Sequence, residues 1–129
     1  MVRAYRESAA LMAGVELGLF TRIAQGCDSE AALPDALRLC PLHVERVVTA
    51  CVRLGLLQRQ AGKLENAPDV QRFLVEDEAQ YAGEWMLFTK PGWNAWGNLS
   101  ESLRDQTPPR ADNVKVSAFS VDDAHKTIA

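Results

Sequence analysis

The segment Pro41–Asn66, PLHVERVVTACVRLGLLQRQAGKLEN, joins a periodic helix to a two-stranded hairpin. Its apolar residues recur at spacings of three and four, which predicts a helix over Pro41–Arg53 with one buried face. Five positions are expected on that face: Val44, Val47, Val48, Cys51 and Leu54. Gly55 ends the helix, and the residues flanking Ala61-Gly62 predict an antiparallel hairpin that turns at this pair. A helix followed by such a hairpin is typical of the second half of a winged helix-turn-helix.

The sequence before this segment predicts the first half of the same fold. A short helix is expected near Pro34–Leu39, with Ser29 as the residue that caps its start. Further upstream, Ala4–Ala24 reads as one very apolar helix. Gly14 and Gly18 within it would either admit a close partner helix or bend it into two. The expected class is therefore mainly α, a winged helix-turn-helix with a small hairpin wing.

Downstream of the hairpin, a short helix through Val70 and Leu74 is followed by a long helix over Ala79–Arg104. Pro91 removes a backbone donor inside this long helix, which predicts a kink near Lys90–Trp93. Its aromatic and leucine residues repeat at helical spacing, and core packing is the expected role of five of them: Tyr81, Trp85, Phe88, Trp96 and Leu99.

Composition fits one globular domain with a short tail. The 129 residues are 47% hydrophobic and carry a formal net charge of −3. Residues 1–105 are expected to form the domain, and 106–129 a linker with the start of a further domain, where Asp122 and Asp123 would cap a helix. No apolar run is long enough for a membrane helix and no export signal is visible. The three cysteines are expected as reduced thiols in a cytoplasmic protein.

Several motifs together resemble a known family. The run Ala13–Phe20, AGVELGLF, is similar to the A-x-E-L-G-L-F helix of small-molecule O-methyltransferases that use S-adenosylmethionine, and those enzymes begin with a winged-helix dimerisation domain. The similarity continues through His43–Val48, Leu54–Leu57, Asn66–Pro68, Tyr81, Trp85, Trp96 and Leu99. It covers roughly residues 4 to 105, and the order and spacing of the motifs make it specific.

The resemblance also implies what this chain lacks. In that family the cofactor and the catalytic histidine belong to a C-terminal methyltransferase domain, with the cofactor on a glycine-rich loop. The eight glycines here include no G-x-G pair, and neither His43 nor His125 lies in a matching position. We therefore expect this chain to bind no S-adenosylmethionine and to have no catalytic residue. The parent enzyme would methylate a hydroxyl of a secondary metabolite, a small aromatic or polyketide acceptor.

The N-terminal helix suggests that the partner is a second copy of the chain. It is apolar around so much of its circumference that a small chain has few elements with which to cover it. A homodimer is expected, and its interface would contain Leu11, Met12, Val15, Leu19 and Phe20.

The residues beside the Pro91 kink are candidates for a substrate wall. Family resemblance implies that the helices after the wing line part of the acceptor pocket. Met86, Thr89 and Trp93 lie on or near a second face there, and a thioether with an aromatic ring suits a flat acceptor.

The charge balance and the cysteine spacing disfavour DNA binding and metal binding. Between Asp28 and Glu76 there are seven acidic and six basic residues, a balance that does not favour DNA binding, so nucleic acid is not an expected partner. A stand-alone winged-helix DNA-binding transcriptional regulator stays as an alternative, and so does the dimerisation subunit of a split methyltransferase. Cys40, His43 and Cys51 fall short of the four ligands of a structural zinc site, so no metal is expected.

Overall fold

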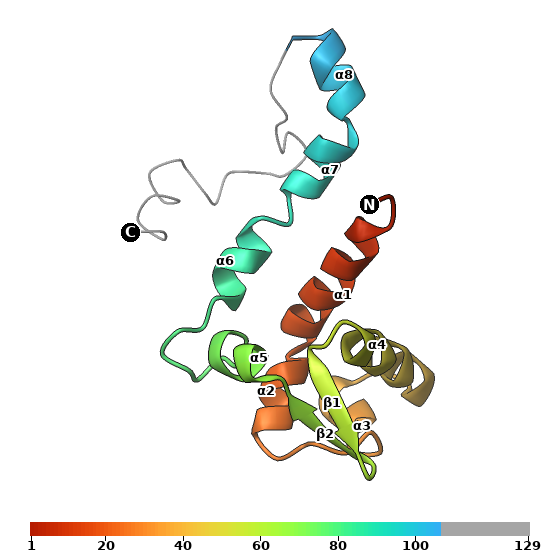
Figure 1. Cartoon of the computed structure of the whole chain (residues 1–129), viewed down its shortest axis with the longest axis vertical. Coiled ribbons are helices and arrows are strands. Elements are labelled where there is room, and N and C mark those ends of the chain that lie inside the picture. Colours follow the sequence, from red (N-terminus) through yellow and green to blue (C-terminus); the bar gives the residue numbers. More distant parts are fainter. Residues whose placement is uncertain (107–129) are drawn as a thin grey trace. The chain divides into compact units, whose positions relative to one another are not determined.

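The computed structural model describes residues 1–106, which are mainly helical with one two-stranded antiparallel hairpin (Figure 1). This confirms the expected mainly α, winged-helix-like class. The chain forms two compact units, Met1–Gly83 and the residues from Glu84 onward. The elements up to the boundary are α1 (Ala4–Leu17), α2 (Leu19–Ala24), α3 (Leu33–Leu37), α4 (Pro41–Arg53), β1 (Leu57–Gln60), β2 (Lys63–Asn66) and α5 (Pro68–Phe73). Those that follow are α6 (Gly83–Phe88), α7 (Gly92–Gly97) and α8 (Leu99–Arg104).

The long helix of the first unit, α4, has the predicted bounds. Val44, Val48 and Cys51 are buried. They lie on the buried face of α4, and α4 contacts α1, α3 and β1. Val47 and Leu54, also expected inside, are half-buried. A Pro at the first helical position and a wholly apolar buried face explain why this helix was predictable from sequence.

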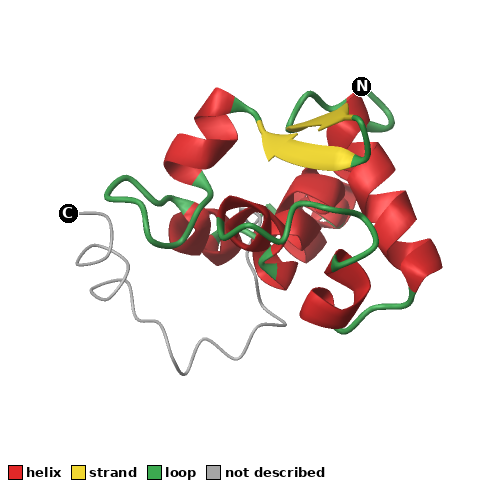
Figure 2. Cartoon of the chain, turned by 90° about the horizontal axis from the view of Figure 1, so that it is seen from below, coloured by secondary structure: helices red, strands yellow, loops and turns green. Residues whose placement is uncertain are grey.

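The hairpin also forms as predicted. Leu57 pairs with Asn66 and Gln60 pairs with Lys63, which leaves Ala61 and Gly62 as the two-residue turn (Figure 2). The φ angles of Ala61 and Gly62 are +51° and +79°, the left-handed pair that a type I′ turn requires.

The segment before α3 adds to this sheet, which the sequence did not indicate. Ser29 forms an isolated antiparallel bridge with Lys63, and the Leu64 N–H donates to the Asp28 carbonyl at 2.7 Å. The expectation that Ser29 caps this helix is wrong, because the N-cap of α3 is Ala32 and α3 begins at Leu33. The Oγ of Ser29 instead accepts the Ala32 N–H at 3.2 Å and closes the turn ahead of α3.

The N-terminal apolar stretch is two helices. Gly18 adopts a φ of +72°, and its N–H donates to the Val15 carbonyl, which ends α1 at Leu17. The chain then turns into α2, which contacts α1, α3, α5 and β2 within the same unit (Figure 1). Of the two expectations for the glycines, the bend at Gly18 is the one that the structure adopts.

The stretch expected as one long helix over Ala79–Arg104 with a single break is three short helices, and the first of them begins only at Gly83. The break at Pro91 was predicted, but a second break falls at Asn98, between α7 and α8. Gly97 and Asn98 are weak helix formers in succession, which explains the interruption. The linker expected beyond Gln106 and the helix start at Asp122 lie outside the described residues.

Candidate functional site

Helix α2 is the centre of the first unit. Leu19 and Phe20 have no exposed surface. Two side chains from distant segments fix the backbone around them. Asn66 of β2 donates from Nδ2 to the Phe20 carbonyl at 2.9 Å, and the Oγ1 of Thr21 accepts the Glu76 N–H at 3.2 Å. The wing and the segment that follows α5 are therefore both attached to α2.

This arrangement changes the argument for the dimer interface. Met12, Val15, Leu19 and Phe20 are all buried within the chain itself, and Leu11 is half-buried. The expectation that a chain of this size cannot cover these residues is wrong, because the bend at Gly18 brings α2 back among the other elements. Whether they contact a second copy stays a prediction, and their burial no longer argues for it.

The three expected substrate-wall residues lie on consecutive turns around the Pro91 break. The Thr89 hydroxyl donates to the Met86 carbonyl at 2.7 Å, and the Trp93 N–H donates to the Lys90 carbonyl at 3.0 Å. Met86 is half-buried, whereas Thr89 and Trp93 are exposed. The break thus places one thioether, one hydroxyl and one indole along a short stretch, and their role in binding an acceptor stays a prediction.

The residues after Glu84 expose more apolar surface than the sequence suggested. Trp96 is 65% exposed and Leu103 is 71% exposed, and the expectation that Trp85, Phe88 and Trp96 pack in a core is wrong. Among residues 84–106, the exposed large apolar side chains are Trp85, Phe88, Trp93, Trp96 and Leu103. Aromatic residues exposed in such density mark a binding surface more often than chance. Helical periodicity alone could not predict this exposure, because an apolar face that packs in the same chain and one that packs on a partner have the same spacing.

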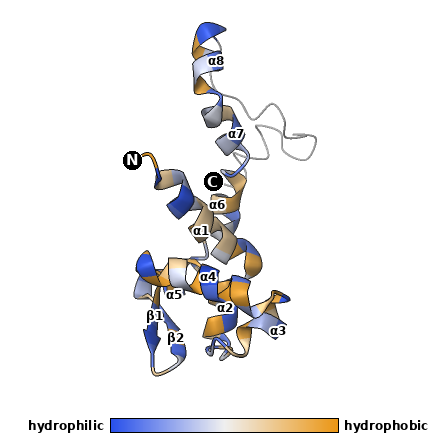
Figure 3. Ribbon diagram, turned by 90° about the vertical axis from the view of Figure 1, so that its right-hand side faces the viewer, coloured by the Kyte–Doolittle hydropathy of each residue, from blue (hydrophilic) through white to orange (hydrophobic). Residues whose placement is uncertain are grey.

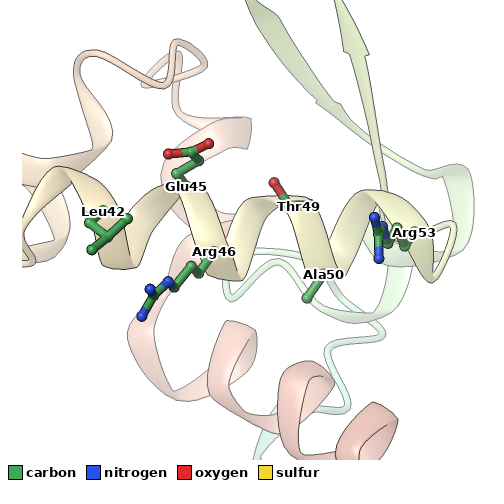
Figure 4. A pocket seen from close by; sticks show the side chains of 6 residues that line it. All are labelled: Leu42, Glu45, Arg46, Thr49, Ala50 and Arg53. Atoms are coloured by element: carbon green, nitrogen blue, oxygen red, sulfur yellow. The ribbon is translucent and has the colours of Figure 1, made fainter.

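Helix α4 carries a shallow hollow on the side opposite its buried face. It has a volume of about 430 Å³. Its lining residues all come from this one helix (Figure 4): Leu42, Glu45, Arg46, Thr49, Ala50 and Arg53. Within residues 1–106, none of the three charged side chains of the hollow forms an ion pair.

The wing adds little positive charge to this surface. The hairpin is mostly hydrophilic (Figure 3), but Arg59, one of its two basic residues, forms an ion pair with Glu30. Glu45 further reduces the positive potential of α4. A winged helix that grips DNA concentrates cations on its recognition helix and wing, and this one does not.

The three cysteines are not paired with one another. Cys27, Cys40 and Cys51 are free thiols, and burial raises the pKa of the Cys51 thiol from 9.0 to about 11. In the part of the chain that the structure describes, no group of three or more His, Cys, Asp or Glu residues could hold a metal ion. No helix among residues 1–106 is long and apolar enough to cross a membrane.

Comparison with known proteins points to methyltransferases. No family model matches the chain. It is 30% identical over 106 residues to the N,N-dimethyltransferase OxyT of Streptomyces rimosus, an alignment that covers 81% of this chain and 31% of OxyT. It is 29% identical over 104 residues to 3-hydroxy-5-methyl-1-naphthoate 3-O-methyltransferase of Streptomyces sahachiroi, covering 78% of this chain and 29% of that enzyme.

The fold recurs in solved methyltransferases. Human N-acetylserotonin methyltransferase, solved in complex with S-adenosylmethionine, superimposes with a TM-score of 0.73 at 23% identity. The match covers 80% of this chain and 32% of the human one. The homologues and structural neighbours of this chain are thus methyltransferases, and the chain spans about a third of the length of the relatives it matches.

Proposed function

We propose that this chain is the winged-helix dimerisation domain of a methyltransferase that uses S-adenosylmethionine and acts on a small molecule. Its homology to methyltransferases, over about a third of their length, is the observation that carries the proposal. The domain consists of residues 1–105, and it works with a C-terminal methyltransferase domain that supplies the cofactor site and the catalytic base.

Homodimerisation is the first part of this function. The exposed side chain of Trp96 in α7 supports it, because burying this ring against a second copy removes apolar surface from water at about 25 cal/mol per Å². Sedimentation velocity of the purified 129-residue chain tests the proposal, and a dimer at micromolar concentration is the expected result. Trp96→Glu should weaken this dimer at least tenfold and leave the chain folded by circular dichroism, since Trp96 is 65% exposed. A wild-type chain that stays monomeric at 100 μM contradicts the dimerisation role.

The cofactor does not fit the described residues of this chain. Cofactor binding in such enzymes needs a glycine-rich loop between a strand and a helix, so that backbone N–H groups approach the ligand. The only strands within residues 1–106 are β1 and β2, which are joined by a two-residue hairpin turn. We therefore expect calorimetric titration of the chain with S-adenosylmethionine to give no heat of binding at micromolar concentrations. One site per chain with micromolar affinity would contradict this assignment.

Shaping of the acceptor pocket is the second part of the function. The acceptor is an aromatic or polyketide molecule with a hydroxyl group, and Met86, Thr89 and Trp93 form part of the wall that holds it. Its test uses the chain joined to its catalytic domain. Trp93→Ala should raise the KM for the acceptor roughly tenfold and leave the cofactor affinity and the dimer unchanged. Trp85→Ala, at another exposed tryptophan, is the matched control. Equal effects of the two substitutions would contradict a specific role for Trp93.

A further inference from the structure

We propose that α4 of one copy packs antiparallel against α4 of a second copy, about a two-fold axis that passes Thr49. The inference rests on the proposed homodimer and names a surface through which its two copies meet. The hollow of α4 carries it, because small side chains, Thr49 and Ala50, occupy the middle of the helix face and larger ones surround them. Small central residues let two helices approach to the 8–10 Å separation of packed pairs.

The charges of this face are self-complementary about Thr49. Glu45 lies four residues before Thr49, and Arg53 lies four residues after it. In an antiparallel pair with a two-fold axis at Thr49, Glu45 of each copy therefore lies opposite the partner's Arg53. The same symmetry forms the contact twice, as an isologous interface requires.

Glu45 and Arg53 have no oppositely charged partner among the described residues. Both are exposed, and neither forms an ion pair within residues 1–106. They cannot pair with each other in one copy, because eight residues along a helix separate them by about 12 Å. A second copy offers each of them an opposite charge.

The same charges also select the register. A shift of the axis by half a residue, to the midpoint of Thr49 and Ala50, would place Arg46 opposite the partner's Arg53. Like charges in contact across an interface oppose association, so this register is disfavoured. With the axis at Thr49, Arg46 lies opposite the partner's Val52 and avoids that repulsion.

A DNA backbone fits the face less well. Its phosphates would meet the carboxylate of Glu45 beside Arg46 and Arg53, and the paired Arg59 of the wing would add little attraction. A second copy fits better, because it offers an arginine to Glu45 and a glutamate to Arg53.

Charge reversal and exchange test the proposal on the 129-residue chain. The dissociation constant of the dimer is measured by sedimentation equilibrium at low salt for the wild type, Glu45→Arg, Arg53→Glu and the double variant. Each single reversal replaces two attractions by two repulsions and should raise the dissociation constant about tenfold. The double variant exchanges the two charges and should return it to within about threefold of the wild type.

A second double variant, Glu45→Arg with Arg46→Glu, is the matched control. It carries the same net charge and the same number of changes on the same exposed face, but it should not restore the dimer. Circular dichroism verifies that every variant is folded. A wild-type dimer that is insensitive to both single reversals overturns the α4 contact and leaves the proposed dimer standing. A monomeric wild type overturns the proposed dimer as well. Salt-sensitive DNA binding that Arg53→Glu abolishes, with an unchanged dimer, also overturns the α4 contact.

Discussion

The phenyl ring of Phe20 lies directly over the backbone of Gly14. A Cβ atom added at Gly14 would sit 2.7 Å from the Cζ of this ring, closer than real Cβ contacts allow. Two glycines four residues apart thus have different roles in the same turn. Gly18 supplies the left-handed backbone that reverses the chain, and Gly14 supplies the space into which the reversed ring packs. The resulting pair of helices buries Phe20 completely.

Gly14→Ala should therefore lower the free energy of unfolding by up to about 2 kcal/mol net, because overpacking a filled core costs about 1–3 kcal/mol. The gain in helix propensity of Ala over Gly, about 1 kcal/mol, offsets only part of this. Thermal unfolding followed by circular dichroism measures the change. Gly97→Ala is the control, because a Cβ there meets no atom within 4 Å and its backbone φ is ordinary. Equal melting temperatures for the two variants would show that Phe20 does not depend on Gly14.

Asn66→Ala should destabilise the fold by about 1–3 kcal/mol, because it leaves the buried Phe20 carbonyl without its donor. Urea denaturation should show a lower midpoint with an unchanged slope. Asn66 also donates to Gln71 at 3.0 Å, and Gln71 is exposed. Gln71→Ala removes that second bond alone, so a loss of about 0.5 kcal/mol or less is expected. If both substitutions cost the same, the link between the wing and α2 contributes nothing of its own.

The stability of the chain should fall above about pH 9. Burial raises the pKa of the Cys51 thiol from 9.0 to about 11, so the folded state favours the protonated form. Below pH 9 both folded and unfolded chains hold this proton, and the contribution is complete. Between pH 9 and 11 the unfolded chain loses it first, and the contribution is lost. Urea midpoints at pH 8 and pH 10.5 measure the fall.

Cys51→Val is the matched variant for this pH dependence, because it fills a similar volume without an ionisable group. Its stability should change less between pH 8 and pH 10.5 than that of the wild type. A thiol reagent at pH 8 should label exposed Cys40 in the native chain but reach Cys51 only on unfolding. Rapid native labelling of Cys51, or identical pH profiles for the two chains, would contradict its burial as the cause.

Ala61→Asn should stabilise the hairpin by about 1 kcal/mol. Ala61 has a φ of +51°, a left-handed conformation that is strained for most L residues. Asparagine tolerates it with less strain, and Asn-Gly is the preferred type I′ pair. The melting temperature measures the gain. Gly62→Ala, at the neighbouring position with a φ of +79°, should lower it instead. A melting temperature that does not rise with Ala61→Asn and does not fall with Gly62→Ala would contradict the type I′ turn.

Much of the first unit could be predicted from local patterns. The bounds of α4, the turn at Ala61-Gly62, the bend at Gly18 and the break at Pro91 all follow from signals that lie within a few residues of the element concerned. The second break at Asn98 was missed, since a glycine and an asparagine inside an otherwise periodic aromatic pattern are tolerated in many helices. The candidate substrate wall could be predicted only as a stretch of residues around Pro91. Which groups lie opposite it depends on segments distant in the sequence, so local patterns do not predict them.

The sequence by itself determined the bounds of α4, the hairpin turn at Ala61-Gly62 and the break at Pro91, because hydrophobic spacing, proline and left-handed glycine act through the backbone over a single turn. Only the tertiary structure decided which apolar residues the chain covers with its own elements. If α1 and α2 formed one helix, Leu19 and Phe20 would need a second copy to cover them. The left-handed residue at Gly18 turns them onto β2 and α5, where Asn66 holds the Phe20 carbonyl. The tryptophans after Glu84 show the same periodicity and stay exposed, since packing depends on contacts between distant segments that no periodicity encodes.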